Sequence, residues 1–191
     1  MKKFIIASTL LTAVLMAGGN VTPVAQVDMK TGMYIGGGVT FSSTYAEDSK
    51  IGDVIGGAVG IDRAMGVSAL VGYEFYQAGN FTASVEGRVG YTGYNADLDY
   101  WTVAAYLKPE YMVTDRFSVY GLVGYGAQFD ADTTDNKRYG LSYGAGVAYR
   151  ATSDVKVFAD VTDFTDVWGD TKGAGMTRDT ARLTIGAQYS W

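Results

Sequence analysis

The stretch Phe81–Tyr91, FTASVEGRVGY, alternates strictly between two kinds of side chain. Its odd positions are apolar or small. Its even positions are polar, charged or small: Thr82, Ser84, Glu86, Arg88 and Gly90. Successive side chains of a β-strand point to opposite faces, so this period of two predicts a strand with one apolar face. Its eleven residues match the roughly 9–11 that a tilted strand needs to cross a membrane.

The same alternation recurs from Met33 onward, and no amphipathic helical period of useful length interrupts it. It defines eight candidate strands: Met33–Phe41, Met65–Phe75, Phe81–Tyr91, Trp101–Tyr111, Phe117–Phe129, Tyr139–Tyr149, Val155–Asp163 and Ala181–Trp191. Short turns and longer acidic loops alternate between them. The short turns are Gln77–Asn80, Val113–Arg116 and Ala151–Asp154, and the long loops are Ser42–Ala64, Thr92–Tyr100, Asp130–Arg138 and Phe164–Thr180. This order predicts an antiparallel up-and-down meander that closes into an eight-stranded barrel.

The even row decides which face of the barrel is inside. It carries charges of both signs, at Glu74, Glu86, Arg88, Lys108, Glu110, Arg150, Lys156, Asp160 and Arg182. Most of its other members are glycine or serine. The interior of an eight-stranded barrel is just wide enough to be filled by side chains, and small residues mixed with a few long charged ones suit it. We therefore place the even row in the lumen and the apolar row outside.

Aromatic residues of the odd row gather at the strand ends. Those beside the short turns are Phe75, Phe81, Tyr111, Phe117, Tyr149, Tyr189 and Trp191, and those beside the long loops are Phe41, Tyr91, Trp101, Phe129 and Tyr139. Two aromatic girdles around an aliphatic band are typical of a barrel that crosses both membrane interfaces. The sequence therefore predicts an all-β transmembrane barrel.

The inward charges are expected to form a network, because an unpaired charge in a narrow lumen costs several kcal/mol. Glu86, Arg88, Asp160 and Arg182 fall near mid-height. Asp160 and Arg182 lie on neighbouring strands, so we expect them to pair. A lower tier is expected to contain Glu74, Lys108, Glu110, Arg150 and Lys156. Such a network either plugs the barrel or, if its charges can exchange partners, gates a very small pore.

The composition excludes several classes of function. The chain has no histidine and no cysteine, so it lacks the commonest general base and metal ligand, thiol nucleophiles and disulfides. A net charge of −5 does not suit nucleic-acid binding. The acidic loop 130–136 is interpreted as a solvated loop and not as a cation site. A carboxylate pair such as Glu86 and Asp160 could suit glycoside hydrolysis, but a filled lumen would keep a sugar chain out. We expect no catalytic, cofactor or metal site.

The chain begins with the pattern of an export signal. Lys2 and Lys3 precede an apolar run, Phe4–Ala17, of about fourteen residues. That length fits the ~7–15 residues of a signal-peptide core and is short of the ~20 of a spanning helix. Small residues place cleavage near Gly19 or Ala25. The predicted organisation is a signal peptide at 1–25 and a barrel domain at 26–191, with a net charge of −7 once Lys2 and Lys3 are removed.

Two segments carry a resemblance to a known family. The last residues, TIGAQYSW, place Thr184, Gly186, Tyr189 and Trp191 in a pattern that resembles the C-terminal assembly signal of outer-membrane barrels, although those usually end in Phe. Leu107–Gly126 resembles a strand–turn–strand segment of single-domain porin-family members. With its eight strands, the chain is similar to the small outer-membrane β-barrel family that includes OmpA-type barrel domains and OmpX.

The resemblance implies a monomer in the bacterial outer membrane, surrounded by its lipid and lipopolysaccharide and inserted by the barrel-assembly machinery. Many OmpA-type proteins carry a peptidoglycan-binding domain after the barrel, and we expect no such role because the sequence ends at Trp191. The enzymes of this scaffold use histidine, so we expect no enzyme. The predicted function is a structural or surface-interaction role with a largely plugged lumen. The alternatives are a narrow porin for ions or small solutes and a soluble periplasmic lipid-binding barrel.

Overall fold

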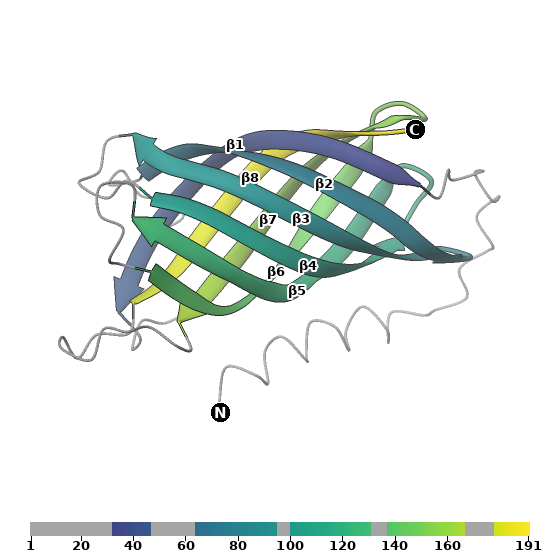
Figure 1. Ribbon diagram of the computed structural model, residues 1–191. Helices are drawn as coiled ribbons and strands as arrows, with labels where there is room; N and C mark the ends of the chain where they lie inside the picture. The colour runs from purple at the N-terminus through teal and green to yellow at the C-terminus, as the bar shows by residue number, and fades with distance from the viewer. Residues whose placement is uncertain (1–31, 47–63, 95–99, 131–136, 167–177) are drawn as a thin grey trace.

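A computed structural model describes residues 32–46, 64–94, 100–130, 137–166 and 178–191 and shows a closed barrel (Figure 1). Its strands are β1 (Met33–Ala46), β2 (Ala64–Ala78), β3 (Phe81–Tyr94), β4 (Tyr100–Met112), β5 (Phe117–Asp130), β6 (Lys137–Arg150), β7 (Val155–Asp166) and β8 (Arg178–Ser190). Each strand pairs antiparallel with the next, and β1 pairs with β8. The predicted fold, an eight-stranded up-and-down antiparallel barrel, is confirmed.

The strands extend beyond their predicted limits, mainly toward the long loops. β1 continues past Phe41 to Ala46, and its added residues pair with the start of β8. The apolar row ends at the aromatic girdle, whereas the hydrogen-bond ladder continues beyond it. Strand limits predicted from hydropathy alone are therefore too short. Only the last prediction is too long, because β8 ends at Ser190. The remaining loop residues and the predicted signal peptide lie outside the described residues.

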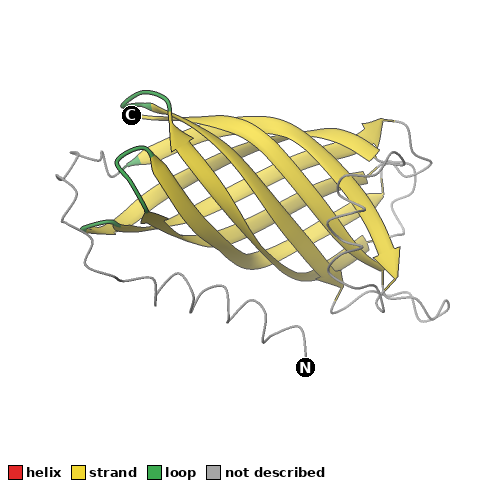
Figure 2. Ribbon diagram, turned by 180° about the vertical axis from the view of Figure 1, so that it is seen from behind, coloured by secondary structure: helices red, strands yellow, loops and turns green. Residues whose placement is uncertain are grey.

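All three short turns and the C-terminus lie at the same end of the barrel (Figure 2). The β2–β3 turn contains Gly79 at φ 57°, a left-handed conformation that glycine adopts at no steric cost. In each of the other two turns, a threonine hydroxyl accepts a hydrogen bond from a backbone N–H three residues later. Thr114 accepts from Phe117 at 3.0 Å, and Thr152 accepts from Val155 at 3.1 Å. We call this the short-turn end and the opposite end the long-loop end.

The alternation of β2 is broken once, near the short-turn end. The register between β2 and β3 shifts between Glu74 and Tyr76, which is the signature of a β-bulge. Phe75 and Tyr76 therefore both lie exposed on the outer face. Tyr76 packs edge-to-face on Phe81 with 6.2 Å between the ring centroids. The bulge thus adds to the girdle an aromatic residue that lies just beyond the predicted strand Met65–Phe75.

The outer surface is an aliphatic band between two aromatic girdles. Most of its valine, leucine and isoleucine side chains are between 39% (Val161) and 61% (Val67) exposed. Aromatic rings contact one another at both ends: the ring centroids of Tyr91 and Trp101, on neighbouring strands, lie 5.0 Å apart at the long-loop end, and those of Tyr189 and Trp191, at the end of β8, lie 6.3 Å apart at the short-turn end. An apolar belt of this kind is stable only where it faces lipid. Among the described residues, no helix is long and apolar enough to cross a membrane.

The lumen holds bulky residues as well as small ones. Its apolar cluster contains Tyr34, Leu70, Tyr106, Tyr120, Leu122, Ala148 and Phe158. Glycines opposite the tyrosines make this possible. A Cβ atom added at Gly72 would collide with the ring of Tyr34, and one added at Gly146 would lie 2.5 Å from the ring of Tyr120. The inward row therefore fills the barrel by laying each large ring over the glycine that pairs with it on the neighbouring strand.

The Gly146→Ala substitution is expected to destabilise the barrel by about 1–3 kcal/mol, because its Cβ would overlap the Tyr120 ring and the Asp160 Cβ atom. Gly121→Ala is the matched control, since its Cβ would meet only Pro109 Cγ, at an ordinary 3.7 Å. Urea unfolding in detergent, followed by the mobility shift of folded barrel on unboiled gels, measures both. Equal midpoints for the two variants would contradict the proposed packing.

Candidate functional site: a charged plug in the lumen

Six charged side chains are buried inside the barrel. They are Glu74, Glu86, Lys108, Glu110, Lys156 and Asp160, each no more than 8% exposed. All belong to the inward row, because the period of two brings every second residue of β2, β3, β4 and β7 to the lumen. Arg88, Arg150 and Arg182 belong to the same row and are partly buried. Ion pairs sort most of these residues into two clusters at different heights.

The middle cluster consists of Glu86, Arg88, Lys108 and Asp160. The Arg88 guanidinium donates two parallel hydrogen bonds to Asp160, from Nη1 to Oδ1 at 2.9 Å and from Nη2 to Oδ2 at 2.8 Å. Its Nε atom donates to Glu86 Oε1 at 2.5 Å. Arg88 is on β3 and Asp160 on β7, four strands apart in the closed order, so this ion pair spans the lumen.

Lys108 completes the charge balance of the middle cluster. Its Nζ atom donates to Glu86 Oε2 at 3.2 Å and to Gln188 Oε1 at 3.4 Å. It also lies 4.4 Å from the ring centroid of Tyr120, within the range of a cation–π contact. Two carboxylates thus face two cations, and the cluster is neutral. Burial of such charges is tolerated only with this degree of pairing.

Two tyrosines supply further hydrogen bonds to the same carboxylates. Tyr34 donates to Glu86 Oε2 and Tyr120 donates to Asp160 Oδ2, both at 2.8 Å. Neither tyrosine is among the site residues predicted from the sequence. Both stand in the inward row, and an aromatic residue in a row of glycine and serine is the signal that could have identified them.

The lower cluster lies nearer the short-turn end and contains Glu74, Glu110 and Lys156. Lys156 Nζ lies 3.0 Å from Glu110 Oε1 and 3.5 Å from Glu74 Oε1. The Ser118 hydroxyl donates to Glu110 at 2.7 Å. Arg150 Nη2 lies 3.9 Å from the Met112 sulfur. The middle and lower clusters together form what we call the plug.

Two expectations about pairing are wrong. Asp160 pairs with Arg88 and not with Arg182, whose Nη1 atom instead donates to Thr102 Oγ1 at 3.0 Å. Lys108, expected in the lower tier, reaches up to Glu86. In the ladder Asp160 faces Thr184 and Arg182 faces Thr162, so the expected partners are only diagonal neighbours. In a narrow barrel, long side chains reach the opposite wall, and this contact cannot be derived from strand adjacency.

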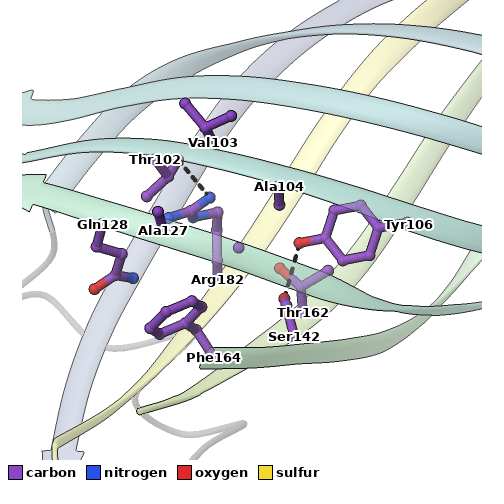
Figure 3. Close-up of a pocket in the computed structure, with 11 residues that line it drawn as sticks. Thr102, Val103, Ala104, Tyr106, Ala127, Gln128, Ser142, Thr162, Phe164 and Arg182 are labelled. Atoms are coloured by element: carbon purple, nitrogen blue, oxygen red, sulfur yellow. Dashed lines mark hydrogen bonds between the residues drawn. The ribbon is translucent and has the colours of Figure 1, made fainter. Parts of the chain in front are cut away.

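A small cavity lies between the plug and the long-loop end (Figure 3). The cavity has room for about one water molecule, since the centre of a water-sized sphere can move within about 10 Å³ there. Its polar lining includes Thr102, Gln128, Ser142, Thr162 and Arg182. We call this region the upper cavity.

The C-terminal pattern occupies both faces of β8. Thr184 is buried in the lumen, whereas Tyr189 and Trp191 are exposed and stack on each other. Exposed aromatic rings at the end of the last strand are accessible to another protein, but their role as an assembly signal stays a prediction. Within the described ranges, no three acidic side chains come together as a metal site. Most of the acidic loop 130–136 lies outside those ranges.

The apolar belt, the girdles and the charged lumen define a transmembrane β-barrel of the bacterial outer membrane. The chain belongs to the outer membrane protein beta-barrel domain family, whose model matches residues 11–190. The alternative of a soluble periplasmic lipid-binding barrel is therefore wrong, since the apolar face is outside and the charges are inside. A search of curated proteins finds no match.

Several solved structures share this fold. The Ail protein of Yersinia pestis matches with a TM-score of 0.55 and 17% identity, over 83% of this chain and 97% of Ail. Neisserial surface protein A matches with a TM-score of 0.51 and 12% identity, over 84% of this chain and 97% of that protein. A de novo designed transmembrane β-barrel matches with a TM-score of 0.50 and 13% identity, over 85% and 98%. At these identities the similarity shows the fold alone.

Removal of Arg88 is expected to destabilise the barrel strongly. The Arg88→Met substitution leaves two buried carboxylates with one cation, a change that typically costs about 3–5 kcal/mol. Urea unfolding in detergent measures the loss, with the exposed turn residue Arg116→Gln as a control that is expected to behave as wild type. In the double variant Arg88→Met with Asp160→Leu, most of the lost stability is expected to return. An additive double variant would contradict the direct ion pair.

Proposed function

We propose that the protein is a closed outer-membrane barrel with a structural and surface-interaction role, in which the plug blocks passage and the barrel anchors the long loops. The observation that carries this proposal is the Arg88–Asp160 ion pair across the lumen. An ion or solute would have to separate two buried charges, each with several hydrogen bonds, to pass this height. The lower cluster imposes a second barrier of the same kind below it.

The lack of histidine and cysteine supports a role without catalysis. Carboxylates are the remaining candidates for acid–base chemistry. Glu86 and Asp160, the pair considered for glycoside hydrolysis, are each 2% exposed and tied to Arg88. A substrate could reach them only through the plug. We therefore propose that the protein is not an enzyme and uses no cofactor or metal.

We propose that its contacts lie at the membrane and at the cell surface. Outer-membrane lipid and lipopolysaccharide suit the apolar belt and the girdles, the barrel-assembly machinery inserts the chain, and the barrel is a monomer. Ail is named as an attachment invasion locus protein, and one of its structures holds the heparin analogue sucrose octasulfate. A surface-attachment role is consistent with that relative. The present chain is acidic, with a net charge of −5, which disfavours a polyanionic or nucleic-acid partner.

A narrow porin is the second candidate, and one observation favours it. Arg88 contacts two carboxylates, and Lys108 has both Glu86 and Gln188 as acceptors. Each cation therefore has a partner to keep if the other contact breaks. Exchange of partners within the middle cluster would open a gap while each cation keeps one partner.

Planar-bilayer recording of the purified, folded barrel distinguishes the two functions. For a plugged barrel we expect no unitary conductance steps in the wild type and in Arg116→Gln, the exposed-turn control. Arg88→Met is expected to introduce steps, because it removes the side chain that spans the lumen. Regular wild-type steps that Arg88→Met changes in size would overturn the plugged barrel in favour of the narrow porin.

A further inference from the structure

We propose that the upper cavity is a binding site for one small monovalent anion of the size of chloride, held by Arg182 and Gln128. This site lies beyond the plug, toward the long loops, and is independent of whether the plug conducts. Three observations carry it: an incompletely bonded guanidinium, an unpartnered amide in the same cavity, and the size of the space between them.

Arg182 is the first observation. Its Nη1 atom donates to Thr102 Oγ1, but its Nε atom is buried and has no hydrogen-bond partner. No described carboxylate lines the cavity that the guanidinium enters. A guanidinium offers five N–H donors and no acceptor, and a hydroxyl neutralises none of its charge. Its surroundings within the described residues therefore lack a negative partner.

Gln128 is the second observation. Its side chain is 7% exposed, and its Nε2 atom is buried without a hydrogen-bond partner. Gln128 lies on β5 and Arg182 on β8, yet both line the upper cavity (Figure 3). Buried donors in native proteins are nearly always satisfied, so two unpartnered donors in one cavity indicate a missing acceptor.

Charge and size identify that acceptor. The middle cluster directly below is neutral, so Arg182 adds a positive charge that the described lining residues do not balance. Water would satisfy the donors and leave this charge in place, whereas an anion satisfies the donors and balances the charge. The hydroxyl of Thr162 also lines the cavity and can donate to the anion, whereas those of Thr102 and Ser142 already donate to the Gly90 and Asp163 carbonyls. A space of this size, about one water molecule, suits a single monatomic anion such as chloride better than the larger sulfate or phosphate.

Chloride-35 NMR line broadening tests the site with chloride as the probe. The folded protein in a zwitterionic detergent is titrated into sodium chloride, and the gel mobility shift confirms folding of every variant. The wild type and the exposed control Arg116→Gln are expected to show saturable excess broadening. Arg182→Gln is expected to weaken chloride binding by at least about tenfold, the scale of a lost charged hydrogen-bond partner. Bromide is expected to compete, and sulfate is not.

A second variant keeps the proposal testable if Arg182→Gln does not fold. Gln128→Glu introduces a carboxylate of nearly the same shape beside Arg182, and this group is expected to take the place of the anion. Saturable broadening should disappear, while the urea midpoint should rise and lose its dependence on chloride. Absence of saturable broadening in the wild type, equal broadening in Gln128→Glu, or competition by sulfate would each overturn the proposal. None of these results depends on the conductance of the barrel.

Discussion

The bidentate ion pair between Arg88 and Asp160 is the constraint on which the rest of the lumen depends. Two charges placed in a narrow barrel must be paired and hydrogen-bonded almost completely, or the barrel loses several kcal/mol. The neighbouring groups meet that demand, since Glu86 accepts a hydrogen bond from Arg88 Nε and Tyr120 donates to Asp160. Room for the Tyr120 ring exists only because Gly146 faces it. A single electrostatic requirement thus determines the placement of charges, aromatic rings and glycine on at least three strands.

The outer face follows the opposite rule. Its valines and leucines remain exposed to about half of their area, which would be unfavourable in water and is favourable in lipid. Mean hydropathy is +0.04 because it averages this belt with the polar lumen row. The average alone would indicate a soluble chain. What distinguishes the protein is that lipid-facing and lumen-facing residues alternate along each strand. This alternation is a property of the order of the residues and not of their composition.

The alternation also explains how far the sequence could predict the structure. It placed Glu86, Arg88 and Asp160 in the lumen and supplied eight strands with their turns, because alternation is a local signal. It did not predict the bulge that places Tyr76 in the girdle, and it gave the wrong partner for Asp160. The bulge depends on a single extra residue that no period reveals. The ion pair depends on the diameter of the closed barrel and on the reach of an arginine, which are tertiary properties.

The plug has a consequence for the barrel wall as well as for the lumen. Replacing a buried ion pair by apolar residues is often neutral for stability, so burial alone does not explain why charges are used. Register does explain it, since a slip of one residue moves every side chain of a strand to the other face. Such a slip in β3 would expose Glu86 and Arg88 to lipid, where an arginine at the midplane costs about 2–4 kcal/mol. An apolar plug would carry no such penalty. The charges therefore favour one strand register of β3 over the alternatives shifted by one residue.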